Sequence, residues 1–345
     1  MINGDLAVSY GTDRVEVSCK SMAEAPKQLN KDGKMTTKVF IDGKAGTTGL
    51  RIYERLQIRK DIQLLTLSDD ERKDPRRRRE MLNACDIAFL CLPDDASREA
   101  VAMIENPDVV VLDTSTAHRT QDDWAYGFPE LSPEFFQKVA NSKRIAVPGC
   151  HASGFIALVR PLIDAGIISA DALLTCHSLT GYSGGGKKMI AEYNDPERPA
   201  LFDAPRQYGL TQQHKHLKEM VKISGCANAP VFCPIVADYY SGMLVTVPLF
   251  KAQLCSGKGV EDIRNVYRSL YNGNMVFYAE EASEGGLLSG NAMSGKDSMQ
   301  IMVEGNDERI LLLARYDNLG KGASGAAVEC MNIVMKQPCE TGLDL

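Results

Sequence analysis

Short apolar runs alternate with helical patterns over the first third of the chain, and this alternation limits the possible folds more than any other feature. Four runs are predicted to be buried strands: 38–42, 62–67, 86–92 and 109–113. Each is almost continuously apolar, as expected for a strand covered on both faces. Helical patterns at 50–58 and 96–104 separate them. Strands connected in this way form parallel sheets through right-handed crossovers, so we expect a doubly wound α/β domain of the Rossmann-like class.

A glycine-rich turn connects the first predicted strand to the first predicted helix. Gly43, Gly46 and Gly49 form the pattern G-x-x-G-x-x-G, a spaced relative of the dinucleotide fingerprint. Glycine permits a tight turn and lets the backbone amides of a helix N-terminus approach a pyrophosphate. Glycine-rich turns are common, but this one opens the first βαβ pattern of the chain. It therefore predicts a nucleotide-binding turn over 43–49.

Cys150 stands between an apolar run and a helical pattern. The run 145–147 meets a Pro-Gly turn, Cys150 follows, and the helical pattern covers 155–165. Cys150 is therefore expected at or just before a helix N-terminus, where unpaired N–H groups and the helix dipole favour thiolate over thiol. Nine other cysteines are present, so a buried cysteine at a tight turn is the plain alternative. A shared sheet edge with the glycine turn and the segment 115–119 favours a nucleophile.

Several motifs occur in a fixed order: 39–49, 89–95, 115–119, 126–131, 148–150, 181–188 and 317–323. Together they resemble the short-chain N-acetyl-γ-glutamyl-phosphate reductases over roughly residues 37–336. These enzymes are relatives of the aspartate-semialdehyde and glyceraldehyde-phosphate dehydrogenases. The resemblance implies the NADPH-dependent reduction of an acyl phosphate, N-acetyl-glutamyl 5-phosphate, to an aldehyde in arginine biosynthesis.

The residues supply the parts that this chemistry needs. A thiolate displaces phosphate from an acyl phosphate, and the resulting thioester accepts hydride where a carboxylate would not. Arg119, which follows the strand-end Asp113, is the predicted phosphate ligand because its planar fork suits bidentate phosphate binding. A surface ion pair is the alternative for Arg119. Ser115 is predicted to add a hydroxyl donor, and the resemblance adds Glu130 to the substrate-binding residues.

One of five histidines is expected to act as general acid and base, because the imidazole pKa lies near neutral pH. His214 and His216 lie in a helical context with Glu219. On a helix, residues three apart share a face and residues two apart do not. His216 is therefore the predicted base, with Glu219 orienting it and His214 facing elsewhere. In an extended segment both histidines would share a face, and because the resembled family has a similar H-x-H, His214 remains the alternate. His151 is expected to point away from Cys150.

The resemblance also implies the cofactor-binding residues: Gly43, Ala45, Gly46, Thr47, Thr48, Gly49, Pro93, Ser183, Gly184 and Asn318. The cofactor's identity depends on the end of the second predicted strand. The acids at 69–71 favour the free ribose of NAD. Ser68, Arg72 and Lys73 instead suit the 2′-phosphate of NADP, and the resemblance favours NADPH.

Other functions compete with this hypothesis. Residues 181–187 match G-x-x-x-x-G-K, but Lys188 stands where an ATPase needs the magnesium-binding Ser or Thr. A nucleotide-sensing regulator would not need Cys150, Arg119 and His216 together. Among the reductases, aspartate-semialdehyde dehydrogenase or another acyl-phosphate reductase is the alternative. Residues 151–153 read His-Ala-Ser, where the resembled family often has an aromatic residue and proline, which leaves the local pocket shape open.

Composition argues against several classes of partner. The 345 residues carry a net charge of −6, which speaks against nucleic-acid binding. The one basic run, 76–79, is expected to start a solvated helix. The longest apolar runs are too short to cross a bilayer. Ten cysteines without C-x-x-C spacing favour reduced thiols in a cytoplasmic enzyme over a zinc site or a disulfide scaffold. We expect a small-molecule substrate, no metal and, from the resemblance, a homodimer or homotetramer.

The length suits two domains. Residues 1–36 have no clear hydrophobic period and are expected to form a flexible extension. Strands outnumber helices in the second half, which predicts an α+β domain on a mostly antiparallel sheet over 151–317. A final helix at 325–335 is implied by the resemblance to return to the first domain. The dinucleotide-binding domain would then comprise 37–150 and 318–345.

Overall fold

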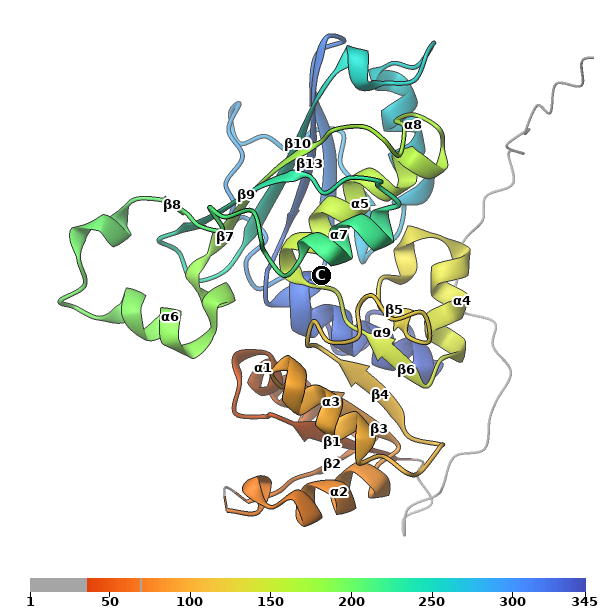
Figure 1. Ribbon diagram of the computed structural model, residues 1–345, viewed down its shortest axis with the longest axis vertical. Helices are drawn as coiled ribbons and strands as arrows, with labels where there is room; N and C mark the ends of the chain where they lie inside the picture. Colours follow the sequence, from red (N-terminus) through yellow and green to blue (C-terminus); the bar gives the residue numbers. More distant parts are fainter. Residues whose placement is uncertain (1–35, 69) are drawn as a thin grey trace, which may run out of the picture.

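The computed structural model describes residues 36–68 and 70–345. The extension predicted at 1–36 lies outside these ranges except for its last residue. Within the described residues the chain forms two sheets, one above the other in Figure 1. None of the helices in these ranges combines the length and the apolar character that a membrane crossing requires.

The first sheet is parallel throughout, as predicted, with strand order β2-β1-β3-β4-β6-β5. Its strands are β1 (Thr37–Asp42), β2 (Ile62–Leu65), β3 (Ile87–Leu90), β4 (Val110–Asp113), β5 (Ala125–Tyr126) and β6 (Arg144–Ala146). Its helices are α1 (Thr47–Leu56), α2 (Pro75–Ala84), α3 (Asp94–Ala102) and α4 (Pro133–Asn141). The basic run at 76–79 lies in the first turns of α2, as expected.

Alternate residues of the strands pack on opposite faces of this sheet. Val39 and Ile41 of β1 belong to one apolar cluster, together with residues of α1, α4 and the last helix, α9 (Gly325–Val334). Phe40 belongs to a second cluster with residues of α2 and α3. Helices therefore cover both faces, which explains why the strands are continuously apolar in sequence. Although α9 comes from the end of the chain, it packs on the first sheet (Figure 1).

The second sheet is mixed and mostly antiparallel, in the order β11-β12-β13-β10-β7-β9-β8. Among the described strands of this sheet, only β7–β9 and β11–β12 pair in parallel. The strands are β7 (Thr175–Gly181), β8 (Arg206–Gln207), β9 (Val231–Ala237), β10 (Met243–Phe250), β11 (Val276–Tyr278), β12 (Met299–Gly305) and β13 (Arg309–Tyr316). The sequence patterns did not predict β9, because Pro234 interrupts its apolar run and proline is unusual inside a sheet.

Three helices pack on one face of the second sheet: α5 (Cys150–Asp164), α7 (Leu217–Ser224) and α8 (Val260–Leu270). A fourth, α6 (Gly186–Asn194), lies beside β8 at the margin of the molecule (Figure 1). Because α5 begins where β6 of the first sheet ends, its N-terminus lies between the two sheets (Figure 1). The chain thus places the first residue of α5 opposite the glycine turn before α1.

Candidate active site

The glycine turn is shaped by close backbone approaches. Gly43 has φ +86°, and a Cβ there would lie 2.2 Å from the carbonyl oxygen of Cys91. A Cβ on Gly49 would lie 2.5 Å from the carbonyl oxygen of Gly43. Gly46 is the N-cap of α1 and supplies no side-chain cap. The amides of residues 47–49 make no hydrogen bond within the described residues, so this helix start fits a phosphate group.

Gly43→Ala should therefore weaken nucleotide binding by opening this turn. Residue 43 would have to keep a left-handed backbone conformation with a side chain, and the added methyl would push against the backbone of Cys91, just after β3, at a cost of about 1–3 kcal/mol. We expect the affinity for a dinucleotide, measured by fluorescence titration, to fall by about tenfold or more. Gly166→Ala is the control, because Gly166 also has positive φ but has open space around it. Equal effects on nucleotide binding in the two variants would contradict this reading of the turn.

Two neighbouring cavities lie between the sheets. The first, here called the loop cavity, is lined by Gly46–Gly49, Cys91–Asp94, Thr114–Thr116, Arg119 and Lys215. The second, the thiol cavity, has a volume of about 290 Å³ and contains Cys150, three histidines and residues of the 183–186 turn. Thr47, Thr48, Thr114, Arg119 and Lys215 line both. A ligand that passes from one cavity to the other would touch these shared residues.

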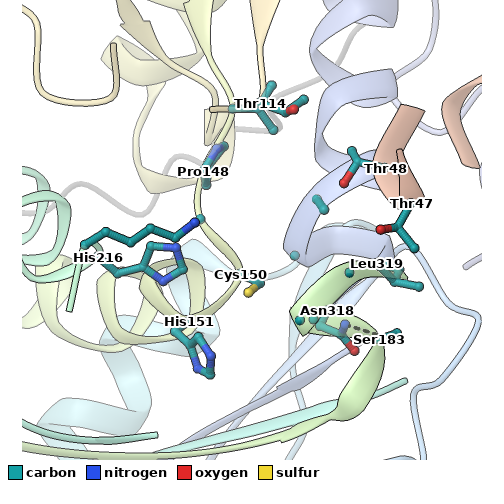
Figure 2. Close-up of a pocket in the computed structure, with 18 of the residues that line it drawn as sticks. Thr47, Thr48, Thr114, Pro148, Cys150, His151, Ser183, His216, Asn318 and Leu319 are labelled. Carbon is teal, nitrogen blue, oxygen red and sulfur yellow. Dashed lines mark hydrogen bonds between the residues drawn. The ribbon is translucent and has the colours of Figure 1, made fainter. Parts of the chain in front are cut away.

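Most of the predicted cofactor residues lie at these cavities. The loop cavity includes Gly46, Thr47, Thr48, Gly49 and Pro93. The thiol cavity includes Ser183, Gly184 and Asn318. The Asn318 amide donates to Ser183 Oγ over 2.9 Å and its oxygen accepts from the Gly242 amide over 2.9 Å, which fixes this wall (Figure 2).

Four predicted cofactor residues lie outside both cavities. Gly43 shapes the glycine turn but lines neither cavity. Ala45 is exposed at the tip of the glycine turn. Ser68 and Arg72 follow β2, and Ser68 donates through its amide and its hydroxyl to the carboxylate of Glu71. The structure therefore brings the pyrophosphate and nicotinamide candidates together and leaves the 2′-phosphate candidates at a distance along the sheet edge.

Cys150 is the first residue of α5, with Gly149 as N-cap, as predicted. The Tyr316 hydroxyl, from β13, donates to the Cys150 carbonyl and accepts from the Gly154 amide, which holds the first turn of α5 in place. Figure 2 shows the Cys150 sulfur with His216 and His151 on one side and Thr47, Thr48, Ser183 and Asn318 on the other. The sulfur is thus between the histidines and the nucleotide residues.

The structure contradicts the expectation that Cys150 favours thiolate. Burial raises the pKa of the Cys150 thiol above its ordinary value. The positive charge of Arg119, the His151 amide and the positive charge of Lys215 lower that pKa without offsetting burial. Cys150 is therefore a thiol at neutral pH and needs a nearby base.

Arg119 is a buried residue held by three protein acceptors. Its Nε donates to the Val147 carbonyl over 2.8 Å, and one terminal nitrogen donates to the Thr114 carbonyl over 2.9 Å. The other terminal nitrogen forms a 3.1 Å ion pair with Glu219. The predicted alternative of a surface ion pair is therefore wrong, because this pair is buried. Of the five N–H groups of arginine, two are left for a ligand.

Glu219 does not orient His216, contrary to prediction. Its carboxylate accepts hydrogen bonds from Arg119, from the Tyr126 hydroxyl at 2.7 Å and from the Gly149 amide at 2.7 Å. His216 is the N-cap of α7, and Glu219 in the first turn faces the start of α5 instead. Glu219 therefore fixes the residue before Cys150.

Three histidine rings gather beside Cys150. The rings of His214 and His216 are 4.8 Å apart, and that of His151 is 5.8 and 5.7 Å from them. His214 precedes α7, so the expectation that it faces away was wrong and both predicted histidines line the thiol cavity. His151 also lines this cavity, contrary to prediction, and its ring nitrogens contact Ser178 Oγ and the Tyr208 hydroxyl, each at 2.6 Å.

All three imidazoles are neutral at pH 7. Burial and the Arg119 charge hold the pKa of His216 well below its ordinary value. Burial lowers the pKa of His214 and brings that of His151 to about 3. His216 Nδ1 is buried and has no hydrogen-bond partner among the described residues. His216 is thus a neutral base with a vacant ring nitrogen, whereas both ring nitrogens of His151 are engaged.

Ser115 and Glu130, the other predicted substrate-binding residues, form their side-chain contacts with other residues of the protein. Ser115 lines the loop cavity, but its hydroxyl donates to Asp113 over 2.7 Å. Glu130 lines neither cavity, and its carboxylate forms a 2.5 Å ion pair with buried Lys321. Sequence reasoning missed Lys215 and Tyr208, which line the thiol cavity. Lys215 could have been identified from the sequence because it lies between two candidate histidines, whereas no sequence pattern marks Tyr208.

Comparison with known proteins places the chain in a family. Residues 38–139 match the NAD-binding domain of semialdehyde dehydrogenases, and residues 150–318 match their dimerisation domain. N-acetyl-gamma-glutamyl-phosphate reductase 2 of Nostoc sp. is 44% identical over 318 residues, covering 89% of this chain and 99% of the relative. The N-acetyl-gamma-glutamyl-phosphate reductase of Sinorhizobium medicae is 44% identical over 308 residues, covering 87% and 99%.

Solved structures share the fold at much lower sequence identity. Aspartate semialdehyde dehydrogenase II of Vibrio cholerae has a TM-score of 0.67 at 18% identity, covering 88% of this chain and 99% of that one. The aspartate semialdehyde dehydrogenase of Francisella tularensis has a TM-score of 0.65 at 14% identity, covering 87% and 100%. With its two matched domains and its 44% identity over most of its length, this chain belongs to the N-acetyl-gamma-glutamyl-phosphate reductase family of oxidoreductases.

Proposed function

We propose that the protein reduces N-acetyl-glutamyl 5-phosphate to N-acetyl-glutamate 5-semialdehyde with NADPH, releases phosphate, and acts in arginine biosynthesis. The main support is the position of Cys150 between a neutral histidine and the residues of the nucleotide turn. The relatives at 44% identity have the name of this activity. Aspartate-semialdehyde dehydrogenase is the alternative, supported by structural neighbours at 18% identity or less.

The proposed reaction uses Cys150 and His216 in sequence. The thiol proton passes to the neutral imidazole of His216, and the sulfur attacks the acyl carbon. The carbon–oxygen bond to phosphate then breaks, which leaves a thioester on Cys150. NADPH, when bound, supplies the hydride that reduces the thioester carbon. The carbon–sulfur bond then breaks and the aldehyde leaves. The proton on His216 goes to the departing phosphate, which leaves as the hydrogen phosphate dianion, and the Cys150 thiolate takes up a proton from solvent.

The decisive assay runs the reaction in reverse. Purified protein is mixed with N-acetylglutamate semialdehyde, phosphate and NADP⁺, and NADPH formation is followed by absorbance. We expect phosphate-dependent turnover with this aldehyde and little with aspartate semialdehyde. A higher kcat/KM for aspartate semialdehyde would refute the proposed substrate. Repeating the assay with NAD⁺ tests the cofactor: a similar kcat/KM with both nucleotides would refute the preference for NADP, which rests on the family resemblance and on Ser68 and Arg72.

His216→Ala should lower kcat by about 10²–10⁴-fold with little change in NADP⁺ affinity, because the variant lacks the base for the Cys150 proton. The depressed pKa of His216 means that the wild-type ring stays unprotonated below pH 6.5. The acidic limb of the wild-type kcat profile should therefore lie below that pH. His214→Ala is the matched comparison, and a larger loss of kcat in that variant would transfer the role to His214.

We further propose that the protein is a cytoplasmic homodimer or homotetramer. One face of the second sheet has apolar side chains open to solvent: Phe250 is 65% exposed, Val231 57% and Leu311 40%. Exposed apolar side chains on a sheet face favour an interface with another chain. The match of residues 150–318 to a dimerisation domain supports this assignment. Sedimentation at micromolar concentration tests it, and a monomer would contradict it.

A further inference from the structure

Two cationic side chains line both cavities, Arg119 and Lys215, and they differ in how their charge is used. Arg119 is 7% exposed and is ion-paired to Glu219, which is 1% exposed. Its positive charge is therefore balanced within the protein before any ligand arrives. The two hydrogen bonds to backbone carbonyls also fix its guanidinium in place. Arg119 is consequently a weak candidate for a phosphate that must both bind and leave.

Lys215 is in the opposite situation. Its ammonium group makes no hydrogen bond and no ion pair among the described residues, and its side chain is exposed at the junction of the cavities. Its charge acts on groups in both: it lowers the pKa of Cys150 and His216 in the thiol cavity and that of Asp94 in the loop cavity. Asp94 is itself engaged with Thr116, whose amide donates to it over 2.9 Å.

We infer that Lys215 is the phosphate-binding residue of this site and that it holds the phosphate which leaves the acyl carbon when Cys150 attacks. A compact ammonium group on a flexible stem can follow a phosphate from the bound ester to the free dianion, which a fixed guanidinium cannot do. Arg119 then acts as a positioning residue, because it holds Glu219 and, through it, the Gly149 amide next to Cys150. This inference rests on the proposed function for the acyl group and for the attack of Cys150 on it.

Two ligands could bring a phosphate to Lys215: the substrate and the pyrophosphate of the cofactor. The free amides of residues 47–49 at the start of α1 can already donate hydrogen bonds to a pyrophosphate in the loop cavity. Cys150 lines only the thiol cavity, and Lys215 is the one cation there whose charge is not paired with a described residue. The substrate phosphate is therefore the assignment to test.

The test measures protection of Cys150 by inorganic phosphate, without any acyl substrate. Cys150 alkylation by iodoacetamide is followed by peptide mass spectrometry across a phosphate titration at constant ionic strength. We expect phosphate to slow labelling of the wild-type protein. In Lys215→Met, the phosphate concentration for half protection should rise by about tenfold to a hundredfold, the effect of losing one charged hydrogen bond. Lys215→Arg should retain most of the protection. The control, Lys218→Met, removes an exposed lysine that lines neither cavity.

A second arm measures NADP⁺ affinity of the same variants by fluorescence titration. We expect Lys215→Met to change it by no more than about twofold. The inference is overturned if phosphate protects the wild-type protein and Lys215→Met equally, or if it protects neither. It is also overturned if Lys215→Met weakens NADP⁺ instead of phosphate, since the charge would then serve the pyrophosphate. Because no acyl phosphate is used, these outcomes stand apart from a failure of the proposed reductase activity.

Discussion

Cys150→Ser is expected to abolish reduction of the acyl phosphate, with a loss of kcat on the order of 10⁴-fold or more. A serine hydroxyl at this position is a far weaker nucleophile than the thiol and stays protonated at neutral pH. The change replaces one atom of a partly exposed side chain, so NADP⁺ affinity should stay within about threefold. Steady-state kinetics and fluorescence titration of the same preparation separate the two quantities.

Cys91→Ser is the matched control for this prediction. Cys91 lines the loop cavity but not the thiol cavity, and burial raises the pKa of its thiol to about 12. This variant should retain kcat within a few-fold. If Cys150→Ser kept a rate near that of the wild type, the thioester route and the role assigned to α5 would both be wrong.

Arg119→Met should lower the free energy of unfolding by about 3–5 kcal/mol, because it leaves the carboxylate of Glu219 buried without its cation. The loss should appear as a shift of the midpoint in urea denaturation followed by circular dichroism. Lys222→Met is the comparison, since Lys222 lies on α7 with Glu219 and pairs with Asp122 at the surface. Breaking that exposed pair should cost less than about 1 kcal/mol.

A double variant separates the buried charge from other effects of Arg119. In Arg119→Met with Glu219→Gln, no charged group is left unpaired, so part of the lost stability should return. If Arg119→Met alone were as stable as the wild type, the ion pair would have no structural importance. Arg119 would then be free to act as the phosphate ligand that its sequence context predicts.

The sequence predicted the α/β fold because its signals are local. Continuous apolar runs mark the strands of the first sheet, and glycine at 43 and 49 marks a turn that tolerates no other residue without strain. The strand β9 was missed because Pro234 breaks its pattern, although a neighbour on each side completes the sheet. Local patterns therefore identified the elements well and failed where one residue departs from the usual preference.

The candidate site was predicted by residue type but not by contact. Cys150, His214 and His216 were identified from their motifs, and the structure brings them into one cavity. The partners of Glu219, Arg119 among them, lie 70 to 100 residues away along the chain, and no sequence periodicity indicates such pairs. The pKa of Cys150 was misjudged for a similar reason, because burial depends on segments that only the folded chain brings together.

The packing of α9 against the first sheet has a consequence for the order in which the protein can fold during synthesis. All the strands of that sheet emerge from the ribosome before residue 150, whereas α9 begins at Gly325. One apolar face of the sheet therefore stays without its last helix until nearly the whole chain is made. The second domain, whose sheet and helices lie between these two segments, can be complete first. The nucleotide domain, although first in sequence, is the last to be finished.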